Sequence, residues 1–196
     1  MITTERIKSA LTDAEWLRAA FHEKELSATA RNRAAIPCLL IAQQHHHSIV
    51  LLIGEKLYAS AYALLRSSLE SYVRGMWLAL CASDEEVKEF WAGQIPPNLK
   101  HLIRRLEHLP AFTGGTLSKI TKEFFSELCD FTHTGGQHVQ RWNATTHIEP
   151  TYEPEEIAYV LSSAENIGVL AVIGTATILN NVELARSVYA RVSFKK

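Results

Sequence analysis

Cysteine is scarce in this chain of 196 residues, which contains only Cys38, Cys81 and Cys129. Because their number is odd and no two of them form a CxxC pair, a zinc ribbon and a thioredoxin-like redox centre are excluded. The N-terminal segment has no apolar core of the kind that a secretory signal peptide requires. We therefore expect reduced cysteines and a cytoplasmic protein.

An excess of one charge is also missing, because 20 Lys and Arg residues balance 21 Asp and Glu residues. No basic run marks a face for nucleic acid. The longest apolar run, 167–179, is shorter than the roughly 20 residues that cross a bilayer, so we expect no membrane segment. The motifs GxGxxG, Walker A, HExxH and GxSxG are absent, which excludes the enzyme classes that they mark.

The sequence offers little for a metal ion, although it contains nine histidines. His45, His46 and His47 are consecutive, so on a helix their rings point about 100° apart and cannot chelate one ion together. Among the other residues, only Asp130 has a spacing that supports His133 and His138 as ligands. We expect neither a metal ion nor a cofactor.

Helical periodicity dominates the chain. Apolar residues recur with helical spacing over about 4–21, 36–80, 116–133 and 157–191. The second of these segments predicts an unusually long central helix, with Pro37 in its first turn. Gly54 and Gly75 are the positions at which this helix would bend. The last segment allows a break near 166–168.

Shorter signals divide the rest of the chain. Ser83 and Glu86 form a capping box, and Asn98 is typical of the residue before a helix. Segment 134–153 shows no helical period and predicts one long structured loop. Residues 1–196 are therefore predicted to form one all-α domain, a helical bundle around the long central helix.

The central helix carries charges in apolar surroundings. From residue 57 to residue 80 it is apolar or small on nearly every face, which is typical of a helix that is buried all round. Arg66 and Glu70 must then meet each other or a polar site, because an unpaired buried charge costs several kcal/mol. They form either an ion pair that ties this helix to a neighbour or the wall of a pocket, which Arg74 would join.

The segment FTHTGGQHVQRW, residues 131–142, follows a predicted helix. Gly135 or Gly136 suits the left-handed position that ends such a helix. A histidine that exchanges a proton near neutral pH, with an arginine beside it, is able to act on a phosphodiester. The catalytic candidates are His133, His138 and Arg141. The structural alternative is a helix cap followed by surface histidines.

The RxxxE pair within LLRSSLESY and the helix that ends in LCDFTHTGG resemble the HEPN-related helical families of bacteria, where HEPN stands for higher eukaryote and prokaryote nucleotide-binding. The resemblance covers about 34–142. It implies a helical bundle, a homodimer and metal-independent cleavage of RNA by a toxin or phage-defence protein. Arg141 and His147 have the spacing of the family's R-x4-6-H motif, whereas Trp142 stands where the family usually has a polar residue.

Two functions follow as hypotheses. The chain is either a metal-independent endoribonuclease that attacks single-stranded RNA, or a non-catalytic helical module that binds a nucleotide, a small ligand or a cognate partner protein. In both cases the expected binding residues are Arg66, Glu70, Arg74, Trp142 and His147.

Overall fold

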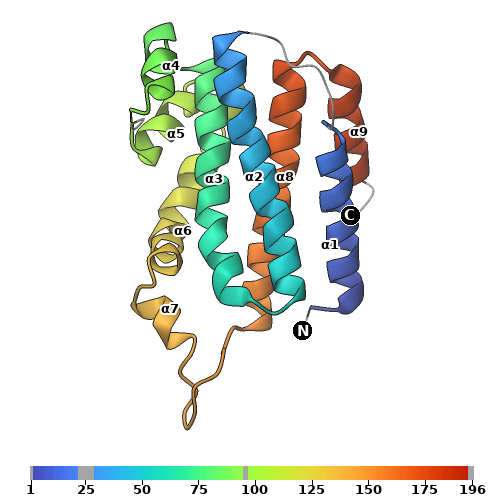
Figure 1. The fold of residues 1–196 in the computed structure, drawn as a ribbon, viewed down its shortest axis with the longest axis vertical. Coiled ribbons are helices and arrows are strands. Elements are labelled where there is room, and N and C mark those ends of the chain that lie inside the picture. The colour runs from blue at the N-terminus through green and yellow to red at the C-terminus, as the bar shows by residue number, and fades with distance from the viewer. Residues whose placement is uncertain (1, 22–28, 95–96, 194–196) are drawn as a thin grey trace.

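The computed structural model describes residues 2–21, 29–94 and 97–193 (Figure 1). Every regular element in these residues is a helix, which confirms the all-α prediction. The helices lie mostly along one axis. Three of them form the centre of the bundle, and the others cover its two flanks (Figure 1).

The centre begins with an antiparallel pair, α2 (Ala30–Gly54) and α3 (Tyr58–Leu80). The prediction of one continuous helix over 36–80 is therefore wrong. The chain reverses through Lys56, whose φ of 60° is left-handed, and the amide of Leu57 bonds to the carbonyl of Leu52 at 2.8 Å. Both helices bury apolar residues. The helical spacing of apolar residues therefore continues across the turn, and the sequence pattern does not mark the break.

Close packing holds α2 against α3. A Cβ atom on Gly75 would lie 2.8 Å from the Leu39 side chain and 3.0 Å from the Ala35 carbonyl oxygen, so this position requires glycine. Pro37 lies inside α2 and not in its first turn, because the helix already begins at Ala30. The α2–α3 pair is thus closely packed at this point.

The third central helix, α8 (Pro154–Ile178), packs on both α2 and α3. Pro154 occupies its first turn, and Glu153 and Glu156 form a capping box. The helix continues through 166–168 and ends only before Leu179. Helix α1 (Thr4–Ala19) packs on α2 and α8, and α9 (Val182–Ser193) packs on α8 (Figure 1).

The opposite flank consists of shorter helices: α4 (Asp84–Trp91), α5 (Leu99–Glu107), the 3-10 turn Pro110–Phe112, α6 (Thr116–Thr132) and α7 (Gly136–Gln140). Both predicted N-terminal signals are confirmed. Ser83 and Glu86 make the capping box of α4, and the side chain of Asn98 accepts from the amide of His101. Helix α6 packs on α3 and thereby brings its C-terminal end to the Arg66 region.

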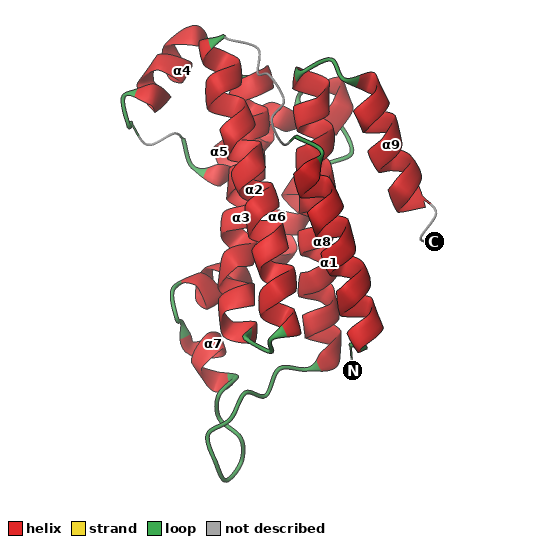
Figure 2. Ribbon diagram, turned by 45° about the vertical axis from the view of Figure 1, so that its right-hand side comes forward, coloured by secondary structure: helices red, strands yellow, loops and turns green. Residues whose placement is uncertain are grey.

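The predicted loop over 134–153 is partly helical, because α7 occupies Gly136–Gln140. The rest projects from one end of the bundle as an irregular excursion (Figure 2). A single antiparallel bridge joins Asn143 and Ile148 within it. The backbone of Thr151 then bonds to the carbonyl of Arg141 at 2.7 Å, which closes the excursion at its base.

Helices α2 and α8 are each long and apolar enough to cross a membrane by length and composition alone. In this bundle half of each apolar window is buried against other helices. The core helix of a folded domain passes the same test, and the central position of the two helices accounts for the buried half of each window.

Candidate functional site

Arg66 of α3 connects two helices at the surface of the bundle. Its Nε atom donates to Oε1 of Glu70 at 2.7 Å. Its Nη1 atom lies 3.0 Å from Nε2 of His133 and 3.2 Å from Sγ of Cys129, both on the α6 side. The structure thus brings together three of the predicted site residues, and it adds the thiol of Cys129.

The Arg66–Glu70 pair is less buried than the sequence predicts. The two side chains are 20% and 25% exposed, so water reaches both groups. Helix α3 is therefore not covered on every side. The charges do meet each other, as expected, but they do so at a polar edge that also includes the exposed His133.

His133 is positioned by the end of α6. It is the residue after the last helical residue, and its amide bonds to the carbonyl of Cys129 at 3.0 Å. The left-handed residue that follows is Thr134, with a φ of 55°, and not Gly135 or Gly136 as predicted. Because a guanidinium only donates hydrogen bonds, Nε2 of His133 accepts from Arg66 and the proton of the neutral ring lies on Nδ1.

Gly135 is required for a different reason. A Cβ atom at this position would lie 2.0 Å from Oδ1 of Asp130. The other carboxylate oxygen, Oδ2, accepts from the amide of His138 at 3.0 Å and so holds the start of α7. Asp130 therefore ties the end of α6 to the short helix that follows it.

His138 faces the interior and not the surface. Its side chain is buried, and its ring packs edge-on against Phe131 with centroids 5.3 Å apart. In this conformation His138 does not reach the Arg66–His133 pair through any hydrogen bond in the described residues. The structure therefore separates two histidines that the sequence placed in one candidate site.

Arg141, at the end of α7, belongs to a second cluster formed by residues of α3, α7 and α8. Its Nη2 atom donates to Glu156, and both residues line a pocket of about 330 Å³ together with Tyr62, Gln137 and Tyr159. The hydroxyl of Tyr62 is buried and has no hydrogen-bond partner among the described residues. Burial, and then the charge of Glu156, raise the pKa of Tyr62.

Of the remaining predicted residues, Arg74 and His147 do not line the Arg141 pocket. Trp142 follows Arg141 directly and contacts Tyr152, whose ring packs against Tyr62. On α2, burial raises the pKa of Cys38, and the charge of Arg74 opposes that shift. Trp142 is 42% exposed. Nε2 of His147 lies 2.8 Å from Oε1 of Glu149, so the R-x4-6-H spacing does not bring His147 to Arg141 in this structure.

Sequence reasoning missed Glu156 and Cys129. Glu156 lies in the first turn of α8, where acidic residues are common, and nothing in the sequence indicates that it faces Arg141 across the excursion. Cys129 is one helical turn before His133, so the histidine's position on α6 was the available signal. In the described residues no three His, Cys, Asp or Glu side chains are grouped to hold a metal ion.

Comparison with known proteins gives one result. Residues 39–195 match a protein family described as a family of unknown function, DUF6988. No curated protein and no solved structure matches the chain. The matched range contains both the Arg66 cluster and the Arg141 cluster.

Proposed function

Since the chain belongs to DUF6988, a family of unknown function, we propose its function from the site itself: a HEPN-like, metal-independent endoribonuclease that cleaves single-stranded RNA at Arg66, Glu70 and His133. The residues of this site differ from those that the sequence predicts. Arg66 takes the place of Arg141, and His138 is not part of the site.

One observation carries the proposal. Nε2 of the exposed His133 lies 3.0 Å from Nη1 of Arg66. A phosphate that replaces this contact would receive a donor from Arg66 and would leave Nε2 free to accept a proton. A general base and a cation within reach of one phosphate are the two groups that metal-independent RNA cleavage needs.

The reaction follows from these groups. Nε2 of His133 takes the proton of the 2′-hydroxyl, whose oxygen attacks the adjacent phosphorus. The bond between phosphorus and the 5′-oxygen breaks, and that oxygen takes a proton from water. Arg66 stabilises the charge that develops on the phosphorane, while Glu70 orients the guanidinium through Nε. The products are a 2′,3′-cyclic phosphate and a free 5′-hydroxyl, and His133 returns its proton to solvent.

The experiment is cleavage of a labelled single-stranded RNA by the purified chain in the presence of EDTA. We expect cyclic phosphate ends from the unmodified protein. His133→Ala should lower the rate by about 100-fold or more, which is the usual contribution of a general base. His101→Ala, an exposed histidine on α5, is the matched control and should cleave normally.

The same experiment contains the result that overturns the proposal. Cleavage that persists in His133→Ala and is lost in His147→Ala would assign the chemistry to the Arg141 region and its R-x4-6-H spacing. Equal cleavage in every variant would identify a contaminating nuclease. If no RNA is cleaved by the folded protein, the proposed activity is wrong.

A second function, a non-catalytic binding module, is favoured by the pocket at Arg141. It has a volume of about 330 Å³, within the range of small-molecule sites. Tyr62, whose buried hydroxyl has no partner in the described residues, is part of its lining. A nucleotide is the ligand to test first. Stabilisation of the protein by a nucleotide that Arg141→Ala abolishes and His133→Ala leaves intact would support this function.

The biological setting belongs to the proposal as well. We expect a cytoplasmic homodimer of toxin or phage-defence type, with a cognate partner protein where the activity must be restrained. The exposed position of His133 fits such control, because a protein that covers it also covers Arg66.

A further inference from the structure

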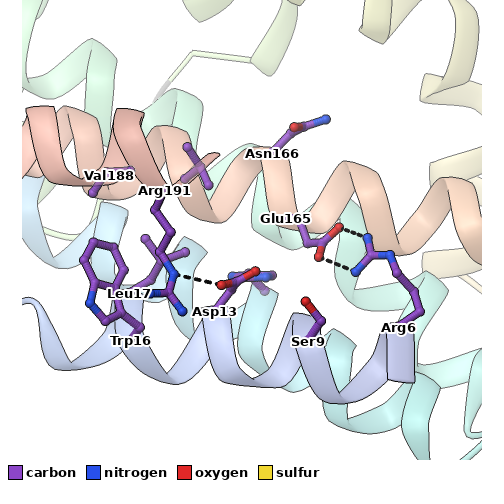
Figure 3. A pocket seen from close by; sticks show the side chains of 11 residues that line it. Arg6, Ser9, Asp13, Trp16, Leu17, Glu165, Asn166, Val188 and Arg191 are labelled. Carbon is purple, nitrogen blue, oxygen red and sulfur yellow. Dashed lines mark hydrogen bonds and ion pairs between the residues drawn. The ribbon is translucent and has the colours of Figure 1, made fainter. Parts of the chain in front are cut away.

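A second, larger pocket lies between α1, α2, α8 and α9 (Figure 3). Its volume is about 450 Å³, which falls in the range of small-molecule sites. The pocket extends along α1 from Arg6, near the start of that helix, to Trp16, near its end. None of the residues of the proposed ribonuclease site lines this pocket.

Part of the lining is an apolar wall that belongs to a small hydrophobic cluster. Leu17 and Val188 are buried in this cluster, whereas Trp16 and Val169 pack against it and are only half-buried. His46 of α2 also lines the pocket, but both of its ring nitrogens are buried and are out of reach of a ligand. The apolar wall is therefore a surface on which an apolar part of a ligand would pack.

Two ion pairs supply the charged part of the lining. Both terminal nitrogens of Arg6 donate to the carboxylate of Glu165, with 2.8 Å between Nη1 and Oε1. Nε of Arg191 donates to Oδ1 of Asp13 at 2.8 Å. Arg6 and Asp13 are both on α1, and two helical turns, roughly 10 Å, separate them (Figure 3). The two cations and two carboxylates together carry no net charge, but they present both signs of charge to the pocket.

Arg191 retains hydrogen-bond donors for a ligand. Its Nε atom bonds to Asp13, whereas its two terminal nitrogens make no hydrogen bond within the described residues. These nitrogens are not among the buried polar atoms, and the side chain is 35% exposed, so a ligand is able to reach them. The guanidinium lies 4.8 Å from the centre of the Trp16 ring, which holds its plane in place. Paired N–H groups of a guanidinium match the two oxygens of a carboxylate.

Glu165 retains hydrogen-bond acceptors. Each oxygen of a carboxylate has two lone pairs, and each oxygen of Glu165 accepts one bond from Arg6, so one lone pair per oxygen remains. The side chain is 21% exposed. An ammonium group has three donors and no acceptor, which makes it the natural partner of such a carboxylate.

We propose that this pocket binds a small zwitterion with an apolar side chain, the chemistry of a free amino acid or a dipeptide. The ligand's carboxylate accepts from the terminal nitrogens of Arg191, its ammonium donates to Glu165, and its side chain packs on the apolar wall. An anion without an ammonium would also face Asp13, and a cation without a carboxylate would also face Arg6. A ligand that carries both charges compensates both repulsions. The site is independent of the proposed ribonuclease chemistry.

Two probes of different length carry this chemistry: L-phenylalanine and L-alanyl-L-phenylalanine, whose charged groups lie one residue, roughly 3.5 Å, further apart. Each is titrated into the full chain labelled with ¹⁵N and ¹³C, and the signals of the Trp16 indole and the Val169 methyl groups are followed by NMR. Each probe has two matched controls, its N-acetyl form without the ammonium and its C-terminal amide without the carboxylate. We expect at least one probe to bind with a Kd of about 1 mM or tighter, and both of its blocked forms to bind about tenfold more weakly or worse.

Two variants assign the ends of the ligand. Arg191→Gln removes the charge that receives the carboxylate, so the probe should bind this variant no more tightly than its amide does. Glu165→Gln should likewise abolish the advantage of the probe over its N-acetyl form. Arg186→Gln alters an exposed arginine of α9 that does not line the pocket, and it should bind as the unmodified chain does. If a pocket variant fails to fold, the comparison of each probe with its blocked forms in the unmodified chain still decides.

Four results would overturn the proposal. The first is that neither probe shifts either signal at about 10 mM, tenfold above the expected Kd. The second is a blocked form that binds as tightly as its probe, which would mean that the pocket does not use both charges. The third is an unchanged preference for the probe in folded Arg191→Gln or Glu165→Gln. The fourth is a shift of the Trp142 indole that spares Trp16, which would place the ligand near Arg141.

Discussion

Nη1 of Arg66 and Nε2 of His133 lie 3.0 Å apart, although 67 positions separate the two residues in the chain. The contact exists because α6 packs on α3 and ends at His133, while Glu70 holds the guanidinium from its own helix. The base and the cation of the proposed site are thus supplied by two different helices. Variants can therefore remove one of them without disturbing the element that carries the other.

The Arg66–Glu70 pair should contribute only modestly to stability. Its side chains are 20% and 25% exposed, so solvent screens the charges. We expect Glu70→Gln to lower the free energy of unfolding by about 1 kcal/mol, well below the roughly 3–5 kcal/mol for breaking a fully buried pair. Urea denaturation followed by circular dichroism measures the difference. A loss of roughly 3–5 kcal/mol would mean that the pair is fully buried in solution.

Gly168→Ala should be strongly destabilising. Its new Cβ atom would lie 2.2 Å from Nδ1 and 2.6 Å from Cγ of His46, and the buried ring cannot move aside without shifting α2. We expect a loss of about 1–3 kcal/mol or more, as for other overpacked cores. Gly136→Ala is the matched control, because nothing lies within 4 Å of its added Cβ atom. Thermal unfolding of both variants should show a lower midpoint for the first and no loss for the second.

The fold was predictable where periodicity and capping residues agree. The all-α class and the start of α4 at the capping box of Ser83 and Glu86 follow from local patterns, because each depends on residues close in sequence. The reversal at Lys56 was not predictable, since α2 and α3 are both apolar and the turn contains no proline and only one neighbouring glycine, Gly54. A non-glycine residue in the left-handed region leaves no pattern to find.

The candidate site was predictable in part for the same reason. Arg66 and Glu70 are one turn apart on one helix, so their contact is local. The contact of Arg66 with His133 depends on how α6 packs, and the separation of His138 from it depends on Asp130 and Phe131. Side-chain direction after a helix end is set by such tertiary contacts, which spacing alone does not encode.

Stability should depend on pH through His46. In the unfolded chain this histidine has its ordinary pKa of 6.5, whereas burial lowers the pKa in the folded protein to about 4. Between these values the unfolded state binds the extra proton, so stability is fully present above about pH 6.5 and is lost as the pH falls toward 4. The complete shift corresponds to about 3 kcal/mol. The charged groups that act on the ring are His47 on its own helix and Asp13 on α1. Arg6, Glu165 and Arg191 line the same pocket as His46.

His46→Phe isolates this contribution. The phenyl ring does not titrate, so the variant should lose less stability than the unmodified chain when urea unfolding is repeated at pH 7.5 and pH 5. His47→Phe, which leaves the buried ring in place, should keep the pH dependence of the unmodified chain. If the free energy of unfolding falls equally for the unmodified chain and for His46→Phe between pH 7.5 and pH 5, His46 is not buried in the neutral form.

A homodimer is expected from the apolar surface that the bundle leaves uncovered. Only half of the apolar window of α2 and half of that of α8 are buried within one chain. Ile41 and Leu51 of α2 are 45% and 47% exposed, and Leu170 of α8 is 41% exposed. A stable interface buries above about 1,000 Å², and large apolar side chains supply most of its energy. Light scattering at micromolar concentration should therefore give twice the chain mass of 22.0 kDa.

Ile41→Glu should shift the mass toward the monomer if α2 forms the interface, and Leu170→Glu should do so if α8 forms it. The monomer mass for the unmodified chain would contradict the dimer.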